Sequence, residues 1–468
     1  MALYAKNYPR FPGPKMERDN LGRVKPESYD NSLYKRNHQY NKNQPYQPYI
    51  FKPNFLKNIP KDAEGNEVQG QDNKKYGRRT IDFCTPSMKY CTRRKYQQFT
   101  NRGLNSYVNI GPGGGTKKHS DTLYSTSQMP VHANKNNTAG IVATRFVRTA
   151  TNKKKCQILK VIWTPDGKRL ITGSNQGEFT LWNGTTFNFE TIMQAHETNI
   201  RSMCWSRNGQ WLLSGDNSGF LKYWQNNMNN VNMFQAHSNC SVRGITFCPD
   251  DSKFATCADD HTIEIWDFAT QTQGRKESRI TLRGHGSEVK VVQWHPIKAL
   301  LASGSKDLQS PVKLWCPKTE KAISTLHCHK GTVMDLKWNK NGNWFATASR
   351  DHLVKVFDIR NLKEELQIFR GHKNEAASLA WHPQHECSLT SGGGDGSIHY
   401  WAVGEENELA HIDKAHFNQD NRTSAIIWSM EWHPLGHLLC TGSQDNTARF
   451  WTRNKPGDDI DETVGWGF

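Results

Sequence analysis

The chain has 468 residues, of which 35% are hydrophobic and 22% are charged, and its formal net charge at pH 7 is +17. It has no run of 18 apolar residues, which argues against a membrane-spanning helix. The first residues, MALYAKNYPRF, lack an apolar segment, so we expect no secretory signal. The eleven cysteines stand singly without a CxxC pair, which favours a reducing compartment over a disulfide framework or a structural zinc site.

The positive charge is concentrated in the first third of the chain. Residues 1–150 contain 26 Lys and Arg against 10 Asp and Glu, whereas residues 151–468 contain 35 against 34. A neutral body with a basic arm indicates that the arm meets a polyanion or an acidic partner. The same charge would also keep a disordered tail in solution, and charge alone does not separate these two interpretations.

The arm changes in character along its length. Residues 1–73 are rich in Asn, Gln, Tyr, Lys and Pro and have few aliphatic side chains, so we predict a disordered tail. In residues 74–143 we predict a basic arm that binds RNA and partners, because KKYGRRTIDF (74–83) and TRRKY (92–96) interleave basic and aromatic residues. Lys and Arg neutralise phosphates, and Tyr and Phe stack on unpaired bases. The same basic clusters would also serve as nuclear import signals.

Residues 144–455 contain a repeat. A Trp or Phe ends a short β-rich run every 42 to 50 residues, and histidines recur between these positions. This is the period of WD40 repeats, each of which forms one four-stranded blade. We therefore predict an all-β fold: a seven-bladed WD40 β-propeller with a mostly irregular basic N-terminal arm and a C-terminal tail at 456–468. The seven terminal aromatic residues are Trp182, Trp224, Trp266, Trp315, Phe357, Trp401 and Trp451.

Most repeats carry an Asp shortly before the terminal aromatic residue, as Asp260 precedes Trp266 and Asp445 precedes Trp451. In WD40 folds this Asp, the loop His, a strand Ser or Thr and the indole form a buried hydrogen-bond chain, which stabilises only when every member is satisfied. Gln176 and Ser218 occupy the Asp position in blades one and two, and blade one lacks the His. We expect these two blades to be held less regularly.

A propeller must close its ring to remove open sheet edges. The segment TRFVRT (144–149) is well placed to be the outer strand of blade seven. Closure by this strand would put the end of the basic arm beside the last blade.

We find no catalytic constellation in the sequence. GPGGGTKK (111–118) resembles a phosphate-binding loop only faintly, because it lacks Gly before the Lys and Ser or Thr after it. His327, Cys328 and His329 are adjacent, and neighbouring residues on a strand face opposite ways, so they do not form a metal site. We expect no enzyme activity, no metal and no cofactor.

Phe189 is a candidate functional residue in the outer strand after blade one. The alternation of a strand puts Phe187 and Phe189 on one face and Asn188 on the other. Judged on this pattern alone, packing of Phe189 against a neighbouring blade is the favoured interpretation.

Several stretches resemble one family, the WD-repeat subunit of the cleavage and polyadenylation specificity factor. The resemblance covers about residues 74–458, including the RRTIDF segment of the arm. The matching stretches are FVRTATNK (146–153), GEFTLWNGTTFNFET (177–191), YWQNNMNNVNMFQAH (223–237), HLVKVFDIRNLKEELQIFRGHK (352–373) and WHPLGHLLCTGSQDNTARFWTRNKPGD (432–458).

The resemblance implies a noncatalytic subunit that works in the nucleus, in pre-mRNA 3′-end processing. It implies a CCCH zinc-finger partner that helps to read an AAUAAA signal, and a large multi-propeller scaffold subunit. Carried onto this chain, Phe189 would stack on a U–A Hoogsteen pair with Ile192 as its apolar neighbour. Thr151 and Lys153 would line the RNA backbone together with Arg78 and Arg79 of the arm. The resemblance thus makes Phe189 an RNA-stacking residue.

The arm departs from the family pattern. Family members have a second stacking aromatic residue about a dozen residues before the basic doublet, where this chain has EGNEVQGQD (64–72). Either Tyr76 is its substitute or the base pair is stacked on one side only. Two alternatives to RNA recognition stay open. Phe357-Asp358-Ile359-Arg360 matches the box of propeller substrate receptors of cullin ubiquitin ligases, although that box is common in propellers. A generic nuclear WD40 assembly hub is the other.

Overall fold

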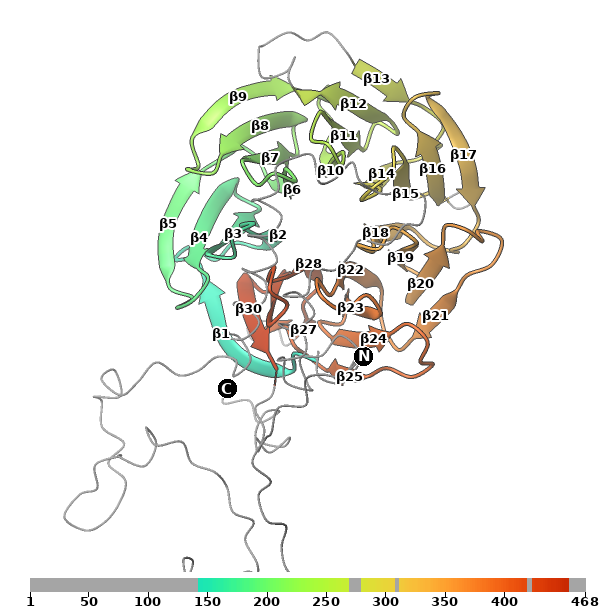
Figure 1. The fold of residues 1–468 in the computed structure, drawn as a ribbon. Coiled ribbons are helices and arrows are strands. Elements are labelled where there is room, and N and C mark those ends of the chain that lie inside the picture. Colours follow the sequence, from blue (N-terminus) through green and yellow to red (C-terminus); the bar gives the residue numbers. More distant parts are fainter. Residues whose placement is uncertain (1–141, 269–278, 308–310, 419–422, 454–468) are drawn as a thin grey trace, which may run out of the picture. The chain divides into compact units, whose positions relative to one another are not determined.

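The computed structural model describes residues 142–268, 279–307, 311–418 and 423–453, all within one compact unit. These residues form seven four-stranded antiparallel sheets arranged as the blades of a ring, together with one two-stranded sheet (Figure 1). The predicted all-β, seven-bladed propeller is therefore confirmed. No helix in these ranges is long and apolar enough to cross a membrane. The predicted divisions at residues 73, 143 and 455 stay predictions, and the predicted tail, arm and C-terminal segment lie almost entirely outside the described residues.

Each blade runs from a strand that lines the centre of the ring to a strand at its rim. Blade one is β2 Ile158–Trp163, β3 Arg169–Ser174, β4 Glu178–Asn183 and β5 Phe189–Gln194. Blade two is β6 Ile200–Trp205, β7 Trp211–Asp216, β8 Phe220–Gln225 and β9 Asn230–Gln235. Blade three is β10 Val242–Phe247, β11 Lys253–Ala258, β12 Ile263–Asp267 and β13 Arg279–Leu282. Blade four is β14 Val289–Trp294, β15 Leu301–Ser305, β16 Val312–Cys316 and β17 Lys321–Leu326.

The remaining blades follow the same plan. Blade five is β18 Val333–Trp338, β19 Trp344–Ser349, β20 Leu353–Asp358 and β21 Gln367–Arg370. Blade six is β22 Ala376–Trp381, β23 Ser388–Gly393, β24 Ile398–Ala402 and β25 Ala410–Ile412. Blade seven is β28 Ile427–Trp432, β29 Leu438–Ser443, β30 Thr447–Thr452 and β1 Arg145–Thr151. The small extra sheet pairs β26 Phe417–Asn418 with β27 Thr423–Ser424.

The core lies between neighbouring blades. The second strands, such as β29, are buried along their whole length, whereas the rim strand β5 is mostly exposed. One apolar cluster joins Leu170 and Trp182 of blade one to Leu438 and Phe450 of blade seven. The sequence of a strand that is buried on both faces is a nearly continuous apolar run. This explains why the alternation of apolar and polar residues is weak in these segments.

The strand β1 closes the ring. Its residues pair antiparallel with β30, from Arg145 opposite Thr452 to Thr151 opposite Thr447. Blade seven thus combines the first strand of the propeller with its last three strands (Figure 1). The predicted closing strand at 144–149 is confirmed, with bounds shifted by one or two residues.

The buried hydrogen-bond chain is present in most blades. In blade seven, Asp445 Oδ2 lies 2.9 Å from His416 Nδ1, and His416 Nε2 lies 2.7 Å from Thr441 Oγ1. The Trp451 indole donates to the same hydroxyl at 3.0 Å. Blades three and four repeat all three contacts, and blade five, which ends in Phe357, repeats the two that need no indole. In blade one, only the bond from Trp182 to Thr172 is present among these contacts.

Blade two takes its Asp from a different position. Asp216, two residues before the usual position, puts its carboxylate 3.4 Å from His196 Nδ1. The same carboxylate accepts hydrogen bonds from the backbone N–H groups of Ser218 and Phe220. His196 Nε2 lies 2.6 Å from Ser214 Oγ, and the Trp224 indole also donates to that hydroxyl. An Asp from a different position thus approaches the His of this blade, but His196 Nδ1 makes no hydrogen bond within the described residues, so the chain of blade two is less regular than that of blade seven, as expected.

Buried histidines make the stability of the propeller depend on pH. Burial lowers the pKa of His285 to about 4, from an ordinary value of 6.5. Because the unfolded chain binds a proton there at higher pH than the folded chain, stability falls as the pH drops from about 6.5 to about 4, on the order of 3 kcal/mol for this group. Thermal unfolding between these pH values should show a shallower slope in His285→Gln than in the wild type. Equal slopes would contradict the assignment.

Candidate nucleic-acid interface

The rim strands β1 and β5 belong to blades seven and one, which adjoin where the ring closes (Figure 1). Arg148 of β1 links them, because its guanidinium donates to the Thr186 carbonyl at 3.1 Å and to Asn188 Oδ1 at 2.7 Å. The sequence offered no signal for this role of Arg148, which depends on two strands that are brought together only by ring closure. We call this region the closure seam, defined by residues 145–153 and 184–192.

Phe187 and Phe189 have different environments, so the prediction that they share a strand face was wrong. Phe187 lies in the turn before β5 with a left-handed φ of 57°, which breaks the alternation of a strand. Its side chain is 3% exposed and packs against Phe450 of blade seven, with ring centroids 4.4 Å apart. Phe187 therefore makes the contact with the neighbouring blade that the pattern alone assigned to Phe189.

Phe189 presents its ring to solvent. It is the first residue of β5, pairs with Trp182, and is 53% exposed. The ring meets the Trp182 indole edge to face, with centroids 6.0 Å apart. Ile192, three residues further along, is 44% exposed. An exposed apolar side chain gains free energy when a ligand covers it. The Phe189 ring, which rests on the buried Trp182 indole, is therefore suited to stacking on a ligand.

Thr151 and Lys153 lie on the other side of the closure seam, and both are exposed. β1 and β5 run in the same direction, because each pairs antiparallel with the third strand of its own blade. Arg148 and Asn188 are joined by a hydrogen bond. Thr151 lies three residues after Arg148 at the end of β1, and Ile192 lies four residues after Asn188 in β5. The fold therefore brings these candidates to one seam.

The charges at the seam favour an anionic ligand. Glu190, the acid next to Phe189, is paired with Arg169 at 2.6 Å and accepts a hydrogen bond from Asn183. Lys153 and Lys154 are exposed just after β1. Lysines near an exposed ring provide the two elements of single-strand recognition, phosphate contacts and base stacking. Tyr76, Arg78 and Arg79 lie outside the described residues, so their place at this seam stays a prediction.

Other candidate sites have structural explanations. His329 belongs to the hydrogen-bond chain of blade five, as predicted. Among the described residues, one group with metal-ligand spacing occurs, formed by His237, Asp260 and Glu264. Both ring nitrogens of His237 are already engaged, by Asp260 and by Thr256. This group is accounted for by the structural chain of blade three.

The box at 357–360 forms a local ion pair. Arg360 makes a bidentate contact with Asp358 across the turn after β20, with a shortest distance of 2.6 Å. This contact lowers the pKa of Asp358 to about 2. The pair fits the structural role that such boxes have in many propellers, and no feature of it favours an adaptor contact.

The comparisons with known proteins agree with this fold. The model for the WD domain, G-beta repeat, matches residues 228–267, 276–308, 320–358, 363–402 and 410–452. A model for the IFT140 first beta-propeller matches residues 143–239. The chain is therefore a WD40-repeat propeller protein, and its closure seam carries an exposed aromatic residue and basic side chains.

The relatives define the family more narrowly. The chain is 41% identical to polyadenylation factor subunit 2 of Schizosaccharomyces pombe over 407 residues, which cover 81% of this chain and 74% of the relative. It is 35% identical to the Yarrowia lipolytica protein of that name, over 84% and 77% of the two chains. It is 45% identical to the Candida albicans protein of that name, and the match covers 69% of this chain but 62% of that relative. The chain belongs to the polyadenylation factor subunit 2 family.

Proposed function

We propose that this protein is a noncatalytic RNA-recognition and scaffold subunit of the pre-mRNA cleavage and polyadenylation machinery, acting in the nucleus. In this proposal it helps to read an AAUAAA-like polyadenylation signal together with a CCCH zinc-finger subunit, on a large multi-propeller scaffold subunit. The name of its relatives, polyadenylation factor subunit 2, supports membership in a polyadenylation complex.

The observation that carries the proposal is the exposed ring of Phe189 on a rigid strand. Sequence-specific RNA recognition works mainly on single strands, whose bases stack on aromatic side chains. In our proposal Phe189 stacks on a base pair formed within the signal, and Ile192 extends the apolar surface. Thr151 and Lys153 contact the RNA backbone, joined by Arg78, Arg79 and Tyr76 from the arm.

The part played by the arm can be tested by the salt dependence of RNA binding. For single strands, each phosphate contact contributes about 0.7 to the slope of log K against log salt. Replacing Arg78 and Arg79 by Ala should therefore lower the slope by about 1.4 when AAUAAA RNA binds the full chain with its zinc-finger partner. The matched control is Lys318→Ala with Lys321→Ala, two exposed lysines of blade four. An unchanged slope, or an equal fall in the control, would remove the arm from the site.

The signal itself is tested in the same assay. The complex should prefer AAUAAA RNA over a permuted hexamer of the same composition, because permutation keeps the charge and changes the base contacts. Equal affinity for the two RNAs would show that the protein contributes only nonspecific backbone binding, which would contradict the proposed function.

A further inference from the structure

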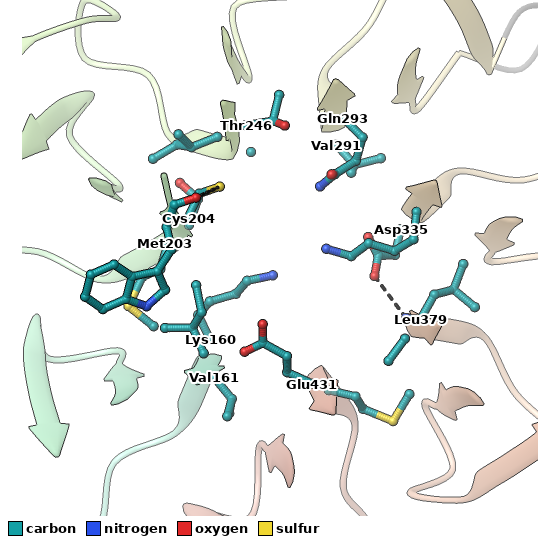
Figure 2. A pocket seen from close by; sticks show the side chains of 18 of the residues that line it. Lys160, Val161, Met203, Cys204, Thr246, Val291, Gln293, Asp335, Leu379 and Glu431 are labelled. Carbon is teal, nitrogen blue, oxygen red and sulfur yellow. Dashed lines mark hydrogen bonds between the residues drawn. The ribbon is translucent and has the colours of Figure 1, made fainter. Parts of the chain in front are cut away.

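The central channel of the propeller is a cavity of about 650 Å³, lined by the innermost strand of every blade. Lys160 of β2, Asp335 of β18 and Glu431 of β28 point into it (Figure 2). The lining contains seven basic residues, Lys160, Arg201, Arg207, Arg243, Lys290, Lys337 and Lys340, against two acidic ones, Asp335 and Glu431. The channel is thus positive, although the body of the chain as a whole is nearly neutral.

Two lining cations, each the second residue of its inner strand, are neutralised, whereas Arg201 at the same position of β6 donates to Asn217 Oδ1. Arg243 forms a bidentate ion pair with Asp259, with a shortest distance of 2.8 Å. Lys290 contacts Asp259 at 3.3 Å and Glu288 at 2.5 Å. The charges of Arg243 and Lys290 are therefore balanced by carboxylates of the protein itself.

Four further lining cations are not neutralised. Among the described residues, no carboxylate lies within ion-pair distance of Lys160, Lys337, Arg207 or Lys340. The ion pairs of Arg243 and Lys290, by contrast, measure 3.3 Å or less. Lys160 and Lys337 are half-buried inside the channel, and Arg207 and Lys340 are exposed at its mouth. Burial, followed by the nearby charge of Lys337, lowers the pKa of Lys160. Unpaired cations in a confined space are costly unless an anion joins them.

The charges of the two acids of the channel oppose the lowering of the Lys160 pKa, but neither acid lies within ion-pair distance of Lys160. Asp335 accepts hydrogen bonds from the backbone N–H groups of Leu336 and Leu379, and the second bond joins blade five to blade six. Glu431 accepts a bond of 2.6 Å from the Trp163 N–H, which joins blade seven to blade one. Burial raises the pKa of Glu431 to about 7, so its negative charge is incomplete at neutral pH.

We propose that the channel binds a compact polyanion with two or more phosphate groups, held by Lys160 and Lys337 inside and by Arg207 and Lys340 at the mouth. A phosphate monoester carries a charge of about −1.5 to −2 at neutral pH, so two or three phosphates match four cations within one small molecule. An acidic peptide would need four carboxylates on four residues to do the same. The volume lies within the range of small-molecule sites, roughly 300–1,000 Å³. This site is separate from the closure seam and does not depend on RNA recognition.

Titration calorimetry of the full chain with inorganic tripolyphosphate, at about 0.15 M salt, tests the proposal. We expect one saturable site. Lys160→Met combined with Lys337→Met should weaken it at least about tenfold, because two charge-assisted contacts are lost. Arg207→Ala with Lys340→Ala should also weaken it, and thermal unfolding of this variant checks that loss of the Lys340 bond to the Pro383 carbonyl leaves the fold intact. Lys318→Met with Lys321→Met, on the rim of blade four, is the matched control and should leave the affinity unchanged.

Proton uptake gives a second measurement. An anion beside Glu431 raises the pKa of its carboxyl group further, so binding near pH 7 should take up a proton and the heat should vary with the buffer. Glu431→Gln should bind tripolyphosphate more tightly and without this proton uptake.

Four outcomes would overturn the proposal. They are the absence of saturable binding, an equal loss in the matched control, loss of binding in Phe189→Ala, and tighter binding of a tetraglutamate peptide that depends on Lys160 and Lys337. The third would place the anion at the RNA surface, and the fourth would assign the channel to acidic peptides. The RNA-binding tests at the closure seam are independent, so either proposal can fail alone.

Discussion

The Phe189→Ala variant is expected to bind AAUAAA RNA more weakly by about 1–3 kcal/mol, the contribution of one base stack, while the propeller keeps its stability. The reason is that the ring is 53% exposed and contacts the protein mainly through the edge of Trp182. Fluorescence anisotropy with the full chain and its zinc-finger partner measures the binding, and thermal unfolding measures the stability.

Two neighbouring variants sharpen this test. Phe187→Ala should do the reverse and lose about 3–5 kcal/mol of stability, because its ring is buried against Phe450. Met233→Ala removes an exposed apolar side chain from the rim of blade two and should change neither property. If Phe189→Ala lost stability in proportion to RNA binding, Phe189 would be a core residue and the stacking role would be wrong.

A chain that begins at residue 156 is expected to lose the native fold, whereas a chain that begins at residue 142 should keep it. The shorter chain lacks β1, so β30 loses its partner strand and the buried Ala150 leaves the core between blades one and seven. The longer chain also keeps Ala143, whose carbonyl accepts a hydrogen bond from the buried Tyr400 hydroxyl. The expected loss is comparable with the whole stability of a domain, about 5–15 kcal/mol.

Circular dichroism and size-exclusion chromatography compare the two truncated chains. Addition of a peptide of residues 142–155 should restore part of the native signal of the shorter chain, since that peptide contains the missing strand. Equal melting temperatures for the two chains would show that β1 does not close the ring in solution.

The sequence predicted the propeller well because the repeat is carried by local features. The spacing of Trp182, Trp224 and the later aromatic residues reflects one strand position in each blade, and period and strand pattern need no tertiary information. The closing strand was also predictable, because an open propeller would leave the edges of two blades unpaired.

Features that depend on tertiary contacts were missed or misplaced. Asp216 approaches His196 of blade two from a position outside the usual spacing, which only the distance between them shows. Phe187 differs from Phe189 through one left-handed residue in a turn, which strand alternation does not anticipate. Arg148 links two strands that meet only when the ring closes.

The two sites differ in how far the sequence pointed to them. Phe189 and Ile192 followed from the family resemblance, and the structure shows both of them exposed. Lys160 and Lys337 are far apart in the sequence and have ordinary neighbours, so no local pattern marks them. Their relation appears only when β2 and β18 line one channel.

The central claim, that this propeller reads a polyadenylation signal, is tested most directly by mapping its ultraviolet crosslinks on cellular RNA at nucleotide resolution. The account predicts crosslinks clustered on an A-rich hexamer just upstream of mRNA cleavage sites, and fewer of them in Phe189→Ala. Crosslinks that are absent there, or concentrated on another RNA such as pre-rRNA, would contradict the claim and would favour a general assembly role for the propeller.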